Sequence, residues 1–234
     1  NAEKEKTEKI RREFTANVSH ELKTPLTTIS GYAQMISNGM AKTEDVKEFG
    51  RKIEKESDRL LTLIDDIINL SNLDEQRSIE NPENIDLSLV TEEAICVLEK
   101  AAKERGIQIY YTKIPTFIKG NVTLVSELVY NLLDNAIKYN KDNGKITVFV
   151  GESAKGVELS VKDTGIGIPP EDTERIFERF YRVDKSHSKK VGGTGLGLSI
   201  VKHVCACHNA TIRVKSKVGK GTTIYVTFPN NVNN

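Results

Sequence analysis

The first third of the chain carries apolar residues at helical spacing. They recur in steps of three and four from residue 10 to 36, and again from 46 to 68 after a break at Asn38-Gly39. The first stripe is Ile10, Phe14, Val18, Leu22, Leu26, Ile29, Ala33 and Ile36; the second is Val46, Phe49, Ile53, Leu60, Ile64, Ile67 and Ile68. This pattern predicts a hairpin of two long amphipathic helices. A hairpin covers only one side of each stripe, so a homodimer that forms a four-helix bundle is expected.

Beyond residue 85 the pattern changes to short β-rich runs alternating with helices. We expect strands at 107–112, 145–150, 157–161, 211–214 and 222–228, and helices at 122–139, 170–180 and 195–208. Residues 86–106 begin extended and become a helix, with Ser88 as the expected N-cap. Helices on one side of a mostly antiparallel sheet make an α/β sandwich.

Composition separates the same two parts. Residues 1–85 hold 3 of the 16 glycines, with 13 basic and 17 acidic residues, whereas 86–234 hold 13 glycines, with 21 basic and 16 acidic residues. A polar stretch, DEQRSIENPEN, lies between them at 74–84. We therefore expect a helical domain at 1–74, a linker at 75–84 and an α/β domain at 85–234.

Whole-chain properties exclude several classes of protein. The net charge of +1 provides no basic field for nucleic acid, and no apolar run approaches the length of a membrane span, so neither nucleic-acid nor membrane contact is expected of this segment. Three cysteines without framework spacing favour reduced thiols and a cytoplasmic setting. The chain opens with Asn1 and no signal peptide, which is typical of a processed or excised chain.

His20 stands off the apolar stripe of the first helix and is expected to face solvent. An isolated surface histidine usually has no function, but its neighbours favour chemistry. Glu21 can orient the ring or take its proton, and Thr24 shares the His20 face and can hold a water. Pro25 removes the N–H that would bond the Glu21 carbonyl, which loosens the helix. An exposed imidazole is mostly neutral at pH 7, as a nitrogen nucleophile requires.

The helix expected at 122–139 has a second, polar stripe beside its apolar face. Its members are Glu127, Asn131, Asn135 and Lys138. A solvated face is one explanation, although asparagine is a mediocre helix former. A metal–phosphate site is the other, because amide oxygens bind Mg²⁺ and lysine neutralises phosphate.

Two glycine-containing segments add nucleotide-type features. Asp163 ends a strand before Gly165 and Gly167, so its carboxylate can accept from an exocyclic amine while the glycines permit close approach. The run GGTGLGLS at 192–199 opens the last helix and can cradle phosphate with N–H groups. It is not a Walker loop, because no lysine follows the last glycine.

Two further segments have competing explanations. The stretch 181–193, YRVDKSHSKKVGG, is either an ordinary loop or a lid whose cations could meet phosphates. Its candidate cations are Arg182, Lys185, Lys189 and Lys190. The run HVCACH at 203–208 suggests metal ligands, but helical spacing scatters them, so core thiols and a helix-end histidine are favoured.

Together these motifs resemble the catalytic core of bacterial sensor histidine kinases, over nearly the whole chain. Residues 14–26 match the family's H box, 127–140 its N box, 163–168 its first glycine box, 177–182 its F box and 193–198 its second glycine box. Residues 219–222 (GKGT) resemble its closing G-x-G-T. The chain is similar to phosphate-regulon and cell-wall sensor kinases. It departs from the family at His208-Asn209-Ala210, where relatives often have His-Gly-Gly.

The resemblance implies a dimeric hairpin carrying His20, followed by an ATP-binding domain of the Bergerat type. It implies autophosphorylation of His20, phosphotransfer to an aspartate of a cognate response regulator, and phosphatase activity toward that regulator. Glu21 would be the general base, and Thr24 would position water for dephosphorylation. The chain would be the cytoplasmic segment of a membrane-anchored sensor whose upstream part lies outside this sequence.

The resemblance also implies ATP and Mg²⁺ as cofactors. Asn131 would coordinate Mg²⁺, and Asp163 would bind the adenine amino group. The other expected nucleotide-binding residues are Asn135, Lys138, Tyr139, Gly165, Gly167, Ile168, Arg182, Gly193, Thr194, Gly195, Leu196, Gly197, Leu198 and Thr222. A chaperone- or topoisomerase-like ATPase, with Glu127 activating water, and a nucleotide-binding scaffold without chemistry share parts of this pattern. The run from His20 to Pro25 favours the kinase.

Overall fold

The chain divides into two compact units, residues 1–69 and 70–234. The computed structural model describes residues 2–75, 79, 81–183 and 193–230. The division falls inside a helix that continues to Glu75, and the next strand begins at Glu83. The domain limits expected from composition, 1–74, 75–84 and 85–234, therefore remain a prediction.

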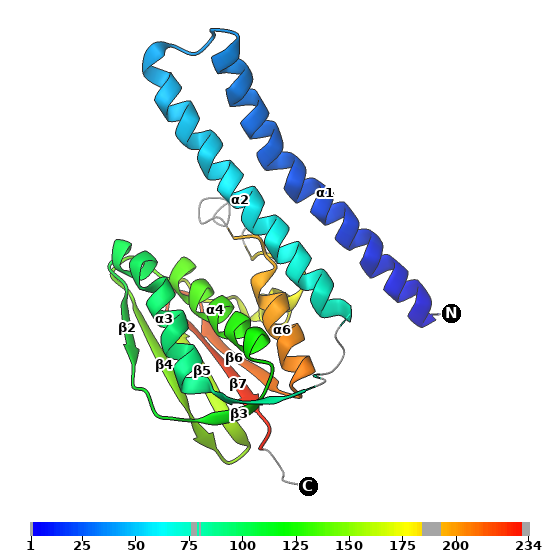
Figure 1. Cartoon of the computed structure of the whole chain (residues 1–234), viewed down its shortest axis with the longest axis vertical. Helices are drawn as coiled ribbons and strands as arrows, with labels where there is room; N and C mark the ends of the chain where they lie inside the picture. The colour runs from blue at the N-terminus through cyan, green and yellow to red at the C-terminus, as the bar shows by residue number, and fades with distance from the viewer. Residues whose placement is uncertain (1, 76–78, 80, 184–192, 231–234) are drawn as a thin grey trace. The chain divides into compact units, whose positions relative to one another are not determined.

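The first unit is a helical hairpin (Figure 1). Helix α1 spans Ala2–Ser37 and helix α2 spans Thr43–Glu75. The expected break is confirmed: Gly39 adopts φ +64°, and the N–H of Met40 donates to the Met35 carbonyl at 3.0 Å, which closes the end of α1. Near the turn, the rings of Tyr32 and Phe49 pack with their centroids 4.9 Å apart.

The hairpin leaves part of both apolar stripes uncovered. Leu26 on α1 is 57% exposed and Ile68 on α2 is 51% exposed. Helix α1 also continues through Pro25, whose side chain is buried. Exposed apolar side chains along a helix pair are suited to packing against another helical surface. None of the described helices combines the length and apolar character needed to cross a membrane.

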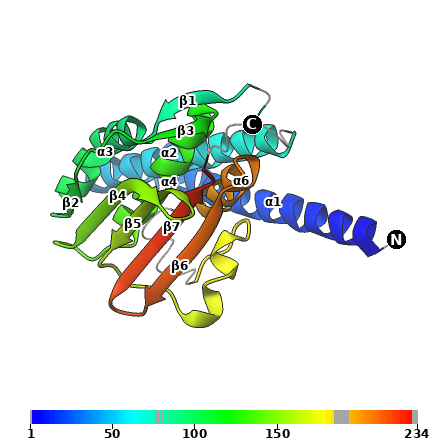
Figure 2. The same ribbon diagram turned by 90° about the horizontal axis from the view of Figure 1, so that it is seen from below.

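The second unit is an α/β sandwich built on a five-stranded sheet (Figure 2). Its strands are β2 (Gln108–Tyr111), β4 (Lys145–Ser153), β5 (Gly156–Asp163), β6 (Thr211–Lys217) and β7 (Gly221–Phe228). They run in the order β2-β4-β5-β7-β6, and only the β2–β4 pair is parallel. Helices α3 (Leu87–Glu104), α4 (Val122–Lys138) and α6 (Gly197–Cys207) cover one face. The five expected strands, the helix at 122–139 and the helix within 195–208 are thus confirmed.

The core lies between these helices and the covered face of the sheet. Side chains that are at most 1% exposed come from both layers. They include Val125, Leu128, Val129, Leu132 and Leu133 of α4, Ile146, Leu159 and Val226 of the sheet, and Ile200, Val201 and Val204 of α6. Burial alternates along β4 and β7, as one covered face requires. This packing fixes α4 and α6 against the sheet.

A small second sheet was not predicted. It pairs β1 (Glu83–Asp86) with β3 (Phe117–Gly120) in antiparallel register. The expected N-cap of α3 was also wrong: Asp86, not Ser88, caps the helix, accepting from the N–H of Ser88 at 3.0 Å and of Leu89 at 3.3 Å. The Ser88 hydroxyl donates to the same carboxylate. A charged acceptor with several donors makes the stronger cap.

The helix expected at 170–180 was wrong as well. Two short 3₁₀ turns, Pro170–Asp172 and Arg175–Phe177, occupy this segment. The backbone becomes extended at Glu178. Only Ile176 is buried within these turns, so no apolar stripe is available to stabilise a longer helix.

His208 joins the end of α6 to the start of α4. Its Nδ1 lies 2.8 Å from the Val204 carbonyl, and its Nε2 accepts the N–H of Asn121, the N-cap of α4, at 3.2 Å. The ring also meets Phe228 edge-on, with centroids 5.9 Å apart. Burial lowers the pKa of His208, opposed by the hydrogen bond to Val204. The neutral ring is therefore the form that fits this site.

The first prediction concerns stability below neutral pH. Because the folded-state pKa of His208 lies below its unfolded value near 6.5, the unfolded chain binds more protons as pH falls. The contribution of His208 is therefore complete above about pH 6.5 and decreases as pH falls toward the lowered folded value. Urea unfolding from pH 8 to pH 5 should show a steeper loss of stability for the native chain than for His208→Gln. If the stability of both proteins fell equally with pH, the prediction would be wrong.

Candidate active site

The polar stripe of α4 combines three residues with side-chain oxygen acceptors and one lysine. Its members, Glu127, Asn131, Asn135 and Lys138, are all half-buried. The Nδ2 of Asn131 donates to the Glu127 carbonyl at 2.9 Å, and that of Asn135 donates to the Asn131 carbonyl at 2.9 Å. Because each amide's donor end is bonded to its own helix, its Oδ1 is directed away from that helix. Such oxygens are the ligands that Mg²⁺ prefers.

Gly197, the first residue of α6, lies against this stripe. A Cβ on Gly197 would come within 2.6 Å of the Asn131 Oδ1 and 3.5 Å of the Asn135 Nδ2. A side chain here would therefore push Asn131 aside. Among the described residues no side chain caps α6 at Leu196, so the first-turn N–H groups remain suited to bind an anion. Amide oxygens and an anion-binding helix end meet at this point.

The loop before α6 is held in place by its own residues. Gly195 adopts φ +77°, and its carbonyl accepts the N–H of Phe180 at 2.9 Å. The buried Thr194 hydroxyl accepts the N–H of Leu196 at 3.3 Å. Leu196 is fully buried and anchors the loop in the core, while Leu198 is half-buried. Of these expected nucleotide contacts, Thr194 and Leu196 thus have clear structural roles.

Tyr139, at the end of α4, connects two of the expected glycine segments. A Cβ on Gly193 would lie 3.0 Å from the Tyr139 hydroxyl. A Cβ on Gly165 would lie 2.2 Å from the Tyr139 carbonyl, which also accepts the N–H of Ile166 at 3.1 Å. Glycine is required at 165 because only its bare backbone fits so close to α4.

Asp163 closes β5 with a mostly buried carboxylate. Its Oδ1 accepts the N–H of Gly165 at 2.8 Å and of Thr222 at 3.2 Å. Burial raises the pKa of Asp163, and the two backbone donors counter part of that rise. A further N–H donor from a ligand would stabilise the ionised form. This arrangement fits the expected recognition of an exocyclic amine.

The turn after Asp163 is bound on its other side to β6. Gly167 adopts φ +72°, and a Cβ there would overlap the Lys217 carbonyl at 2.2 Å. The N–H of Ile168 donates to the Ser216 hydroxyl at 2.8 Å, which pairs with the Thr222 hydroxyl at 2.8 Å. The Ile168 N–H therefore holds the turn, and its half-buried side chain is the part left to meet a ligand.

In the described part of the chain, the cations expected to bind phosphate have no contact that establishes this role. Lys138 forms an ion pair with Asp134 at 2.7 Å. Burial lowers the pKa of Lys138, but the charge and hydrogen bond of Asp134 outweigh it, so the net pKa is raised. Lys138 thus stays a cation whose contact with phosphate would require exchange of partners. Arg182 is half-buried, and its phosphate contact stays a prediction. Lys185, Lys189 and Lys190 lie outside the described residues.

Arg105 and Asn140 support the end of α4, and neither was selected from the sequence. The Arg105 guanidinium donates to the carbonyls of Ile137, Lys138 and Asn140, the last at 2.7 Å. The Asn140 Oδ1 accepts the Thr164 hydroxyl at 3.2 Å. Asn140 falls within the segment that matches the N box, which was a usable signal. No sequence signal indicated a role for Arg105, because its partners lie more than 30 residues away along the chain.

His20 is exposed on α1, as expected from its position off the apolar stripe. The Thr24 hydroxyl donates to the His20 carbonyl at 3.1 Å, which places it one turn along the same face. Glu21 is half-buried and faces α2, where Arg59 lies 3.6 Å from its carboxylate. His20 and the stripe of α4 therefore belong to different units of the chain.

The run at 203–208 has a structural role. Burial raises the pKa of Cys205 to about 12 and also raises that of Cys207. His208 bonds two backbone groups, as described above. Within the described parts of the chain, no three His, Cys, Asp or Glu side chains are grouped to hold a metal ion. Core packing therefore explains Cys205, and the contacts with two backbone groups explain His208.

The same two units match two known families. Residues 10–76 match the His Kinase A (phospho-acceptor) domain, and residues 120–232 match the histidine kinase-, DNA gyrase B- and HSP90-like ATPases. The chain belongs to the sensor histidine kinases of two-component systems. His20 lies within the first match, and the stripe of α4, Asp163 and the glycine loop lie within the second.

Individual relatives agree with this assignment. The chain is 39% identical over 224 residues to the sensor-like histidine kinase SenX3 of Mycobacterium tuberculosis, covering 95% of this chain and 54% of that protein. It is 35% identical over 230 residues to the sensor protein kinase WalK of Staphylococcus aureus, covering 97% and 55%. The chain therefore spans about half the length of these relatives.

A solved structure shares the fold. The histidine kinase ThkA, determined in complex with the response regulator TrrA, superposes with a TM-score of 0.74 and 24% identity, covering 98% of this chain and 66% of that one. This likeness confirms the helical hairpin followed by the α/β ATPase domain.

The second prediction tests the contact between Gly197 and the stripe of this histidine kinase core. Gly197→Ala should displace the Asn131 amide and weaken Mg²⁺·ATP binding by about tenfold, measured by calorimetry, with little change in melting temperature. Gly31→Ala is the matched control, because a Cβ there meets nothing within 4 Å. It should leave binding unchanged and stabilise α1 by about 0.5–1 kcal/mol. Equal ATP affinity in both variants would contradict the prediction.

Proposed function

We propose that the chain transfers the γ-phosphoryl group of ATP to His20 and then passes it to an aspartate of a response regulator. The observation that carries this proposal is the solvent-exposed His20 beside Glu21, in the same chain as a glycine-lined cradle of amide oxygens and helix N–H groups. A nucleotide-binding scaffold or an ATPase would have no need of such a histidine.

The chemical step follows from these groups. A ring nitrogen of His20 attacks the γ-phosphorus; the N–P bond forms as the P–O bond to the β-phosphate breaks, and ADP leaves with the electron pair. The ring proton passes to Glu21. Asp163 holds the adenine amine, and the N–H groups at the start of α6 bind the phosphates, so the protein acts chiefly by positioning and by balancing charge.

A magnesium ion fits the same cradle. The Asn131 Oδ1 is directed toward Gly197, where glycine leaves room between α4 and α6. Asn131 would hold the ion, with phosphate oxygens as further ligands. When bound, Mg²⁺ would neutralise charge on the β- and γ-phosphates.

The remaining roles concern assembly and partners. The exposed apolar positions of α1 and α2 support a homodimer in which two hairpins form a four-helix bundle. The regulator bound to the fold relative ThkA supports a response regulator as partner. We assign phosphatase activity toward that regulator to Thr24, and a cytoplasmic position within a membrane-anchored sensor to the chain. The names of the relatives, sensor-like histidine kinase and sensor protein kinase, support a place within a sensor protein.

The third prediction separates the kinase from its two alternatives. Incubation with γ-labelled ATP and Mg²⁺ should give an acid-labile label on the native chain and none on His20→Gln, which removes the nucleophile. Both proteins should bind ATP equally, because His20 lies outside the nucleotide unit. Release of free phosphate without protein label would indicate an ATPase, and neither product would indicate a scaffold.

The fourth prediction concerns dephosphorylation. Thr24→Ala should retain His20 labelling but lose most of the capacity to dephosphorylate a regulator found by phosphotransfer from the labelled kinase. Thr27→Ala is the matched control, because its hydroxyl makes the same backward bond, to the Lys23 carbonyl at 2.8 Å. It should keep both activities. Equal phosphatase rates in the two variants would remove Thr24 from this role.

A further inference from the structure

Arg59 on α2 is a cation held between two acids. It lies 3.6 Å from the Glu21 carboxylate across the hairpin and 3.7 Å from that of Glu56 on its own helix. The side chain of Arg59 is 17% exposed, and those of Glu21 and Glu56 are 25% and 24% exposed. Limited access to water makes such a charge contact stronger than one at the open surface.

The arrangement bears directly on His20. Adjacent helix residues point about 100° apart, so Glu21 does not face the His20 ring by helical geometry alone. Instead Glu21 faces α2, and the group that meets it there is Arg59. The position of the carboxylate beside His20 therefore depends on a residue of the other helix.

We propose that Arg59 is a positioning residue for the phosphorylation of His20. Its contact with the Glu21 carboxylate holds that side chain at the level of His20 on the hairpin, in position to accept the ring proton. Arg59 takes no part in the transfer itself: the proton moves from His20 to Glu21 while the N–P bond forms and ADP leaves. This role rests on the proposed function.

Loss of the cation would change the local charge balance. Without Arg59, the carboxylates of Glu21 and Glu56 lose the cation that lies between them and are left with like charge. A shift of α2 against α1 would have a similar effect, because the 3.6 Å contact spans the two helices. The rate of phosphorylation thereby becomes sensitive to the geometry of the hairpin.

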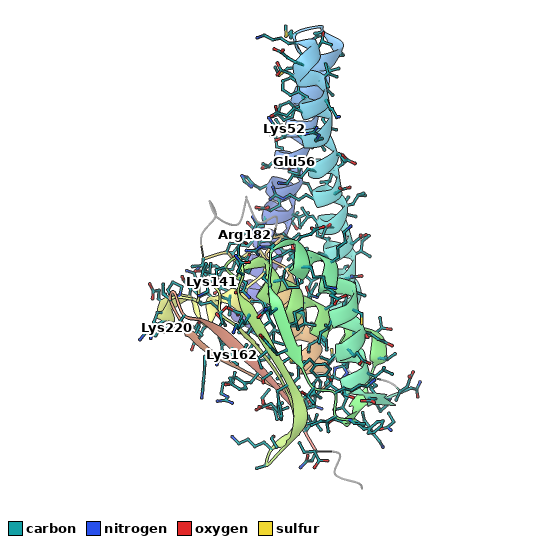
Figure 3. All side chains as sticks on the ribbon, turned by 90° about the vertical axis from the view of Figure 1, so that its left-hand side faces the viewer. Lys52, Glu56, Lys141, Lys162, Arg182 and Lys220 are labelled. Atoms are coloured by element: carbon teal, nitrogen blue, oxygen red, sulfur yellow. The ribbon has the colours of Figure 1, made fainter. Side chains whose placement is uncertain are left out.

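Single variants test whether the cation is needed. In the full chain, Arg59→Met should slow single-turnover labelling of His20 by about tenfold, with the ATP dissociation constant and melting temperature unchanged. Arg59→Lys should restore much of the rate. The control is Lys52→Met, which removes a cation of α2 whose ion-pair partner is Glu48 at 2.6 Å and whose contact across the hairpin is the Tyr32 ring at 5.3 Å, not Glu21. Figure 3 shows Lys52 and Glu56 on α2, with Lys52 nearer the hairpin turn.

A double-mutant cycle tests whether Arg59 acts through Glu21. Glu21→Gln alone should be slow, and Arg59→Met should add little to it, since the partner is already gone. Fully additive losses would overturn the proposal, and so would a normal rate in Arg59→Met or a fall in ATP affinity of the size of the rate loss. Fast labelling by Glu21→Gln with slow labelling by Arg59→Met would overturn the role of Arg59 while leaving the kinase activity established. Absence of label on the native chain would overturn both.

Discussion

The nucleotide site depends on one mostly buried carboxylate. Asp163 stands at the end of β5, where a charged group is costly unless donors surround it. Its donors are the main-chain N–H groups of Gly165 and Thr222, from the following turn and from the first residues of β7. Satisfying Asp163 therefore fixes three segments at once. In the proposed function a ligand amine would complete the set, so the same carboxylate would both connect these segments and recognise the ligand.

The packing of helix α4 on the sheet determines where the polar residues of the site lie. Leu128, Leu132 and Leu133 are at most 1% exposed and hold the helix on the sheet, while the asparagines on its other side line the cradle beside Gly197. Arg105 donates hydrogen bonds to carbonyls at the C-terminal end of the helix. The side chain of Asn140 accepts the hydroxyl of Thr164, which lies in the turn after β5. The amide oxygens are thus positioned by a helix fixed along its length and at its end, as a precise binding site requires.

Local sequence patterns were sufficient for most of this architecture. Period-two and period-3.6 alternation identified the five strands, α4 and the hairpin, because each buries one face. The 3₁₀ turns at 170–177 escaped prediction because local composition does not show how little of that segment is buried. The strand pair β1–β3 escaped prediction because it joins residues more than 30 positions apart. The cap by Asp86 uses the local N–H groups of Ser88 and Leu89, and the distant N–H of Thr116 adds a contact at 3.4 Å.

In the candidate site, too, local features could be predicted from the sequence, whereas contacts between distant elements could not. Glu127, Asn131, Asn135 and Lys138 could be grouped from spacing alone, since four residues on one helix face need no tertiary information. The meeting of Gly197 with Asn131 could not, because it depends on how α6 packs beside α4. Likewise, the sequence itself shows that Glu21 follows His20, but the contact of Glu21 with Arg59 arises only when α2 folds back on α1.

The separation of the two units has a kinetic consequence. His20 and Glu21 are set by contacts within the hairpin, and the nucleotide cradle by contacts within the α/β unit. Each part is therefore complete before the two meet, and the entropy of orienting its groups has already been lost on folding. What remains for the proposed transfer is an encounter between the two parts. Under the proposed function, a change in the hairpin would alter this encounter and the contact between Arg59 and Glu21 while leaving the contacts of the nucleotide cradle intact.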